Sequence, residues 1–353
     1  MQHGLQHGCF TALVTPFNED GAIDYTGLEN IISFQIEYGI TGILAVGTTG
    51  ESPTLTWDEH IQIIDTVAAR TRGRCAAIAG TGSNNTVESI SATGHAVKAG
   101  CDAVLMVDPY YNGPSSLEIR REYIAPVARA YPDMTIIPYV IPGRTGTQLL
   151  PEDLALIYRD HPNAGYVKEA TGNLDNMRRT RACCGNGYTI LSGDDAIALE
   201  MMIDPEIRGT GMISVMSNIA PKAVTEMVNR LIEGDIEGAT RLNTALSPLF
   251  GLVTVTTNED TPYGTVSCRA RNPLPVKALM HIMGILQGNC RRPLGKMTRK
   301  GLQKVLETGR QVYRENPEIL KPAAEFFNVD LEARLNDPGL EKTYCDKLCY
   351  PDY

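Results

Sequence analysis

Gly39-Ile-Thr-Gly-Ile-Leu-Ala-Val46 contains the unit from which the fold is built. A glycine that can end a helix is followed by a polar residue and then by a short apolar run of strand length. The same order returns in Gly100-Cys-Asp-Ala-Val-Leu-Met-Val107. The two stretches therefore predict a repeated unit in which a helix leads into a buried strand.

Similar apolar runs recur up to about residue 215, separated by amphipathic segments such as Trp57, Ile61, Ile64 and Ala68, which share one helix face. Eight strands alternating with helices can close as a parallel (β/α)8 barrel, a TIM barrel, with the active-site loops at the carboxyl ends of the strands. An open doubly wound sheet is the alternative. It would usually carry a Gly-x-Gly-x-x-Gly nucleotide loop between a strand and a helix, and the sequence has none there. The runs are 10–14, 42–46, 75–79, 103–107, 134–139, 165–167, 188–191 and 212–215.

The rest of the chain divides into two further regions. The barrel is expected to occupy residues 1–220, and helical patterns predominate from Pro221, so residues 221–314 should form a C-terminal helical region. Within it, residues 251–272 are rich in threonine and turn residues, which predicts a loop or hairpin insertion. Residues 315–353 form a polar C-terminal extension whose role the sequence does not indicate.

Composition excludes several classes of partner. A net charge of −9 opposes binding to nucleic acid, and no lysine- or arginine-rich run offers a local exception. No stretch of about 18 apolar residues predicts a membrane span, and residues 1–9 lack the features of a secretion signal, so a cytoplasmic protein is expected. The nine scattered cysteines suit reduced thiols, and neither Cys345 and Cys349 nor the histidines have the spacing of a metal site. We expect no nucleic-acid or membrane partner and no metal.

Lys168 is the candidate nucleophile. It lies at the end of the short apolar strand in Gly165-Tyr-Val-Lys-Glu-Ala-Thr-Gly172. Loss of hydration at such a position lowers the pKa of a lysine, and the neutral amine can then attack a carbonyl to form a Schiff base. Taken alone, the same lysine could also extend to solvent from the strand end.

Polar side chains follow the ends of other strands. Gly47-Thr-Thr-Gly-Glu51 offers hydroxyl and backbone donors for a small carboxylate, although it could be an ordinary capped turn. Asp108-Pro-Tyr-Tyr-Asn112 and Tyr139 bring phenols to the barrel mouth, where they could relay protons or simply line the rim. Arg144 offers a guanidinium to a second carboxylate, and Ser192-Gly-Asp-Asp195 permits close backbone approach.

Taken together, these segments resemble the dihydrodipicolinate synthase and N-acetylneuraminate lyase family of class I, Schiff-base aldolases. The resemblance runs from about Phe10 to Leu306, and its markers occur in the family's order at strand ends. Such a set is far more specific than any one member, so it favours Lys168 as the nucleophile. The markers are residues 47–51, 109–112, 139, 167–173, 192–195 and 211–215.

The resemblance implies a site and an assembly. Lys168 would form an imine with pyruvate without any cofactor, and Thr48, Tyr139 and Tyr111 would form a proton-relay triad. Tyr111 would reach into the site of a neighbouring subunit, which implies a homo-oligomer, either a dimer or a tetramer built of dimers. The pyruvate pocket would be completed by Thr48 together with Thr49, Gly193 and the carbonyl of Ile213.

Arg144 carries the implication about the second substrate. In dihydrodipicolinate synthases an arginine in the matching Tyr-Asn-x-Pro-x-Arg-Thr-Gly segment grips the carboxylate of aspartate semialdehyde. The resemblance therefore implies condensation of pyruvate with L-aspartate 4-semialdehyde to 4-hydroxy-tetrahydrodipicolinate, in lysine and diaminopimelate biosynthesis. Val140 departs from the pattern, because asparagine is typical after the tyrosine.

Two other functions stay open. Residues 54–59 and 203–207, together with the long C-terminus, resemble aromatic hydratase-aldolases of the same superfamily. The alternative is thus a pyruvate-dependent aldolase or hydratase-aldolase for a sugar-acid or aromatic aldehyde. A non-catalytic barrel should have lost part of the lysine, tyrosine and threonine set, and none is lost.

The resemblance also implies a regulatory site. Many synthases of the family bind lysine as a feedback inhibitor in a cleft at the dimer interface. This chain has polar residues at the matching positions and Trp57 where bacterial enzymes often have histidine, although these side chains could be ordinary interface residues. The other positions are Ser52, His60, Asn84, Glu88 and Tyr110.

Overall fold

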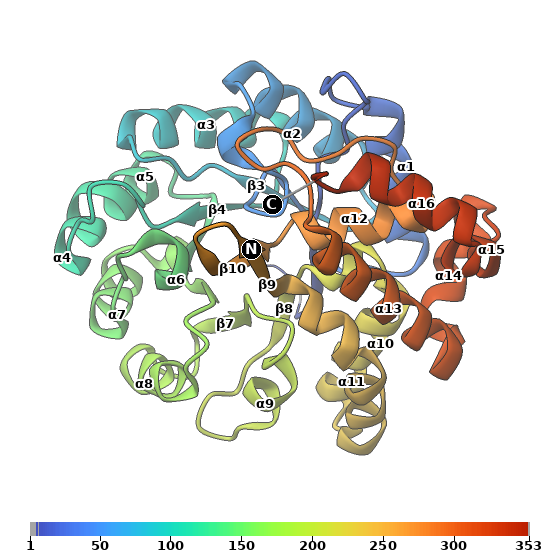
Figure 1. Ribbon diagram of the computed structural model, residues 1–353. Coiled ribbons are helices and arrows are strands. Elements are labelled where there is room, and N and C mark those ends of the chain that lie inside the picture. The colour runs from blue at the N-terminus through green and yellow to red at the C-terminus, as the bar shows by residue number, and fades with distance from the viewer. Residues whose placement is uncertain (1–4, 6, 352–353) are drawn as a thin grey trace.

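In the computed structural model, which describes residue 5 and residues 7–351, eight parallel strands close into a barrel in sequence order (Figure 1). The last strand pairs with the first, from Gly8 opposite Gly211 to Thr11 opposite Ser214. The predicted (β/α)8 barrel is therefore confirmed. The strands are β1 (Gly8–Ala12), β2 (Gly42–Ala45), β3 (Ala76–Gly80), β4 (Ala103–Val107), β5 (Thr135–Val140), β6 (Tyr166–Glu169), β7 (Thr189–Ser192) and β8 (Gly211–Ser214).

Alternate residues of each strand point into and out of the barrel. Phe10 belongs to an apolar cluster inside the barrel, whereas its neighbour Cys9 belongs to the cluster between strands and helices. Both faces of the strands are buried, which explains why they read as continuous apolar runs rather than as alternating ones. Near the carboxyl end of the strands, Tyr139 lies at the top of the inner cluster, where packing gives way to the site.

Helices cover the outside of the barrel (Figure 1). The longest of the helices before β8, α2, is capped at its N-terminus by Thr56, which forms a reciprocal capping box with Glu59. No helix of the described residues is long and apolar enough to cross a membrane. The helices up to β8 are α1 (Tyr25–Glu37), α2 (Trp57–Thr71), α3 (Thr86–Ala99), α4 (Ser116–Glu118), α5 (Ala125–Ala130), α6 (Pro142–Thr145), α7 (Pro151–Asp160), α8 (Leu174–Cys184) and α9 (Ala198–Ile203).

After β8 the chain is mainly helical, with one hairpin. β9 (Thr254–Thr261) and β10 (Gly264–Arg271) pair antiparallel within the segment that the sequence marks as a loop or hairpin insertion. Figure 1 shows this hairpin in brown near the centre of the view, and its last residues contact the mouth of the barrel. The helices around it are α10 (Pro221–Glu233), α11 (Ile236–Phe250), α12 (Leu274–Ile282) and α13 (Arg299–Glu315).

The polar extension folds into three helices, α14 (Pro317–Phe327), α15 (Leu331–Asn336) and α16 (Pro338–Leu348). Phe326 and Phe327 pack on Phe34 of α1, with ring centres 5.2 and 5.1 Å apart. At its far end, Leu348 accepts a hydrogen bond from the backbone of Met297 at 2.8 Å. The extension therefore packs on the first helix and on the loop before α13. The predicted barrel range 1–220 and the predicted extension 315–353 include residues 1–4, 6 and 352–353, which lie outside the described residues.

Candidate active site

Lys168 is buried inside the mouth of the barrel. It pairs in register with Tyr139 of the neighbouring strand, and its Nζ lies 4.4 Å from the centre of that ring. Only 4% of the residue is exposed. Burial lowers the pKa of the amine to about 7, an effect that the Asp195 carboxylate opposes and the Arg144 guanidinium reinforces. At neutral pH a large fraction of Lys168 is therefore the neutral, nucleophilic amine.

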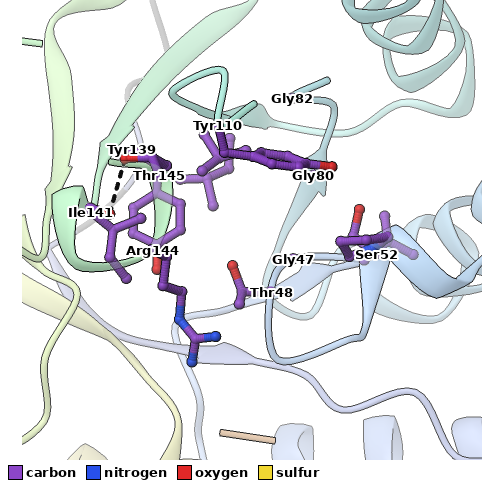
Figure 2. A pocket seen from close by; sticks show the side chains of 14 residues that line it. Gly47, Thr48, Ser52, Gly80, Gly82, Tyr110, Tyr139, Ile141, Arg144 and Thr145 are labelled. Atoms are coloured by element: carbon purple, nitrogen blue, oxygen red, sulfur yellow. Dashed lines mark hydrogen bonds between the residues drawn. The ribbon is translucent and has the colours of Figure 1, made fainter. Parts of the chain in front are cut away.

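Tyr139 and Thr48 face the same space. Both side chains line the cavity, and Figure 2 shows them there together with Arg144. Burial raises the pKa of Tyr139, partly opposed by Arg144 and Thr48. The phenol is therefore protonated at neutral pH and can donate a proton. The cavity has a volume of about 200 Å³, which suits a small substrate.

The turn from Gly47 to Glu51 is held in an unusual backbone conformation. Val46 has a φ of 48° and Glu51 a φ of 57°, and the left-handed region is unfavourable for a β-branched residue such as valine. Behind the turn, the buried Glu51 pairs with Lys277 at 2.6 Å, and its other oxygen accepts from the Arg291 backbone at 2.8 Å. These contacts support the turn that carries Thr48 at the cavity and the buried Thr49 next to it.

Gly193 and Ile213 lie on neighbouring strand ends. A Cβ on Gly193 would stand 3.0 Å from Cε of Lys168 and 2.8 Å from Cβ of Ala170, so a larger residue would push against the lysine. Ile213 is fully buried in the inner cluster that includes Tyr139. Gly193 thus borders the Lys168 side chain, and the role of both residues in binding pyruvate stays a prediction.

Arg144 lines the cavity from the short helix α6. Its Nη2 donates to the backbone carbonyl of Asn272 at 2.9 Å. Burial lowers the pKa of the guanidinium, which remains charged because an arginine ordinarily titrates far above neutral pH. Val140, the departure from the family pattern, packs in the outer cluster between strand and helices and so points away from the cavity.

Tyr111 is not brought to the site of its own chain. It lies on the loop after β4 and is 86% exposed, whereas its neighbour Tyr110 lines the cavity (Figure 2). Within this chain, then, two members of the expected triad meet and the third does not.

The residues expected to bind lysine lie beside the cavity, on α2, α3 and adjacent loops. The Oγ of Ser52 and Nε2 of His60 are 3.1 Å apart, and the rings of Trp57 and His60 are 5.0 Å apart. Trp57, His60 and Glu88 line a second hollow of about 150 Å³. Asn84 accepts a hydrogen bond from the Tyr110 backbone at 2.7 Å.

Four residues that support the site are not identified as site residues by the sequence: Asp195 and Glu51 lie inside quoted motifs without a predicted role, and Asn272 and Lys277 lie in no motif. Asp195 is buried, accepts from Ser214 and from the Val215 backbone, and is the carboxylate that acts on Lys168. Asn272 donates to the Thr49 hydroxyl at 2.9 Å. Glu51 and Lys277 support the turn. The partners of Asn272 and Lys277 lie more than 220 residues away in sequence, so no local pattern could identify them.

Nothing in the structure marks a metal centre. Among the described residues, no group of three or more His, Cys, Asp or Glu side chains is placed to hold a metal ion. All nine cysteines lie in the described part of the chain and carry free thiols.

The chain matches the dihydrodipicolinate synthetase family over residues 5–311, a range that ends inside α13. It is 41% identical to a 4-hydroxy-tetrahydrodipicolinate synthase of Nitrosococcus oceani over 288 residues, which is 82% of this chain and 92% of the relative. It is also similar to the solved structure of the 4-hydroxy-tetrahydrodipicolinate synthase of Methylacidiphilum fumariolicum, with a TM-score of 0.80, 33% identity, and coverage of 90% of this chain and 99% of that one. The dihydrodipicolinate synthase of Cyanidioschyzon merolae, solved with lysine bound, gives a TM-score of 0.78 and 33% identity over 89% of this chain and 99% of that one. These matches confirm the resemblance: the chain belongs to the dihydrodipicolinate synthetase family.

Proposed function

We propose that this protein is a 4-hydroxy-tetrahydrodipicolinate synthase, a lyase that condenses pyruvate with L-aspartate 4-semialdehyde. The observation that carries the proposal is the buried amine of Lys168, which lies beside Tyr139 in the cavity that Arg144 also lines. The names of the similar proteins agree with this activity.

The reaction starts at Lys168. Its neutral amine attacks the ketone carbon of pyruvate, and loss of water from the resulting carbinolamine leaves an imine. Tyr139, which lines the cavity together with Thr48, supplies the proton for the departing hydroxide. Thr48 and Thr49 hold the carboxylate of pyruvate. The protonated imine takes up the electron pair when the methyl group loses a proton, so the reaction needs no cofactor.

The second half joins the two substrates. The enamine carbon attacks the aldehyde, whose oxygen receives a proton from the tyrosine relay, and Arg144 holds the carboxylate of the aldehyde substrate. The amino group of that substrate then attacks the imine carbon, closes the ring and releases Lys168. Pyruvate and aspartate semialdehyde thus give one ring product and one water.

We propose that Tyr111 completes the relay in a neighbouring subunit, since it is exposed here and its own cavity lacks it. This requires a homo-oligomer. Mixing inactive Lys168→Ala with inactive Tyr111→Phe should restore activity through hybrid dimers that contain one intact site. No recovery despite demonstrated subunit exchange would remove Tyr111 from the relay.

The cytoplasmic location stays a prediction.

A coupled assay tests the activity. Pyruvate should condense with aspartate semialdehyde at a higher kcat/KM than with sugar-type or aromatic aldehydes. The carboxylate of aspartate semialdehyde, so close to its aldehyde carbon, can pair with the Arg144 guanidinium while the aldehyde reacts. Arg144→Ala should lower kcat/KM for aspartate semialdehyde about 30- to 1000-fold and leave imine formation with pyruvate nearly unchanged. A wild type that prefers an aldehyde without a carboxylate would instead favour the hydratase-aldolase alternative.

We also propose that lysine binds beside Trp57 and Glu88, the latter offering a carboxylate to its ammonium. One similar protein has lysine bound in its solved structure. Trp57 is the only tryptophan of the chain, so its fluorescence should change as L-lysine is added and inhibition appears. Glu88→Gln should weaken both effects together. Inhibition with no fluorescence change would place lysine elsewhere.

A further inference from the structure

The β9–β10 hairpin carries two arginines, Arg269 and Arg271, and brings the second of them to the short helix α6 after β5, at the mouth of the barrel. Residues alternate between the faces of a strand, so Arg269 and Arg271 share one face of β10 and Ala270 lies on the other. Ala270 pairs with the buried Val255, so the arginines are on the face turned away from that packing. Arg271 Nη1 donates to the carbonyl of Gly143 at 3.2 Å.

Gly143 directly precedes Arg144, so the Arg271 guanidinium contacts the backbone next to Arg144, and the Arg144 guanidinium in turn contacts the backbone of Asn272 next to Arg271. Among the ion pairs of residues 5 and 7–351, none includes Arg144, Arg269 or Arg271. Arg271 and Arg269 each help to lower the pKa of Arg144, after burial as the main cause. In a chain of net charge −9, positive charge is thus gathered at one place with no carboxylate of the described residues in ion-pair distance of it.

Hydrogen bonds fix the end of the hairpin at the mouth of the barrel. Asn272, the next residue after β10, donates to the Thr49 hydroxyl at 2.9 Å and accepts from Arg144 at 2.9 Å. It joins the turn that holds pyruvate to the arginine that faces the second substrate. Arg271 therefore has a defined position beside the cavity.

Like charges that lie close together repel, and the repulsion is relieved when an anion lies between them. A planar guanidinium matches a carboxylate, and two can share its oxygens. We infer that Arg271 is a specificity-determining residue, which forms with Arg144 a paired guanidinium site for the carboxylate of the aldehyde substrate. This inference rests on the proposed function and adds a residue of the hairpin to it.

A purely structural role for Arg271, as a tether to the Gly143 carbonyl, predicts different results. Arg271→Gln keeps a hydrogen-bond donor and removes the charge, whereas Arg271→Lys keeps the charge. Lys304→Gln is the matched control, because Lys304 also donates to the hairpin, to the Thr256 carbonyl at 2.7 Å, but from α13.

The measurement is kcat/KM for aspartate semialdehyde and for an aldehyde without a carboxylate, alongside borohydride trapping of pyruvate. Arg271→Gln should lower the first about 10- to 100-fold, leave the second and the trapping within about twofold, and weaken the salt dependence of the first. Arg271→Lys should recover much of the loss, and Lys304→Gln should match the wild type.

Two outcomes overturn the inference. Arg271→Gln could retain the discrimination of the wild type, or it could lose activity equally with both aldehydes, as expected of a tether. Failure of the proposed function gives a separate result, because the wild type itself would then not condense pyruvate with aspartate semialdehyde.

Discussion

Two buried lysines of this protein differ in whether a carboxylate pairs with the side-chain amine. Lys168, in the barrel mouth, and Lys277, in the seam between the barrel and α12, are 4% and 2% exposed, and each lies over an aromatic ring, at 4.4 and 4.3 Å. Lys277 pairs with Glu51 at 2.6 Å and donates to the carbonyl of Thr15 at 3.0 Å. Lys168 has no carboxylate within ion-pair distance among the described residues. A buried lysine that is paired with a carboxylate keeps its ammonium form. A buried lysine without such a partner favours the neutral amine, which is the nucleophilic form.

The largest expected effect is on the chemistry of Lys168. Lys168→Ala should abolish the borohydride-trapped pyruvate adduct and lower kcat by more than about 1000-fold, since no other group can form the imine. Mass spectrometry of peptides from the wild type should place the adduct on the Lys168 peptide. An adduct on the Lys277 peptide would break the comparison.

The free energy of unfolding should depend more strongly on Lys277 than on Lys168. Lys277→Met leaves Glu51 buried without its partner and should lower the free energy of unfolding by about 3–5 kcal/mol, measured by urea denaturation. Lys168→Met removes an amine that has no partner and should be neutral or stabilising. The double variant Lys277→Met with Glu51→Gln should recover part of the loss. Equal destabilisation by the two single variants would contradict the distinction.

The pH dependence should follow the amine. Trapping at limiting pyruvate should rise with pH through about 7, because the neutral form of Lys168 reacts. The folded-state pKa lies below the unfolded value of 10.5, so between pH 7 and 10.5 the unfolded chain binds more protons and this lysine makes stability rise with pH. Lys168→Met should flatten that slope. A trapping rate that is constant from pH 5 to 9 would contradict the shift.

The smallest effect concerns Asp195. Its charge opposes the lowering of the pKa of Lys168, so Asp195→Asn should move the midpoint of the trapping profile to lower pH by a small amount. Asparagine keeps an oxygen that can accept from the Val215 backbone, which limits structural loss. Movement of the midpoint to higher pH would show that Asp195 acts on Lys168 by another route.

The sequence identifies what depends on local pattern. Apolar runs predict the barrel strands, and the strand-end motifs with the family resemblance point to Lys168, Tyr139 and Thr48, which the structure brings together. Contacts between distant segments leave no such pattern. Arg271 meets Gly143 across 128 residues, and Lys277 meets Glu51 across 226.

The sequence does not indicate the role of the C-terminal extension, for a related reason. Its apolar residues pack on another helix that lies far away in the sequence, and Pro317 and Pro322 within α14 obscure the helical pattern. Pro317 in fact stands at the first turn, where proline is tolerated.

The packing of α14 on α1 has a consequence for how the protein is made. Phe34 is fully buried, and part of its cover is Phe326 and Phe327, which leave the ribosome about 290 residues later. During synthesis at about 5–20 residues per second, this face of the first helix stays uncovered for many seconds. The nascent chain thus carries an exposed aromatic surface until its last helices emerge, and a message truncated before α14 would yield a barrel with that surface permanently bare.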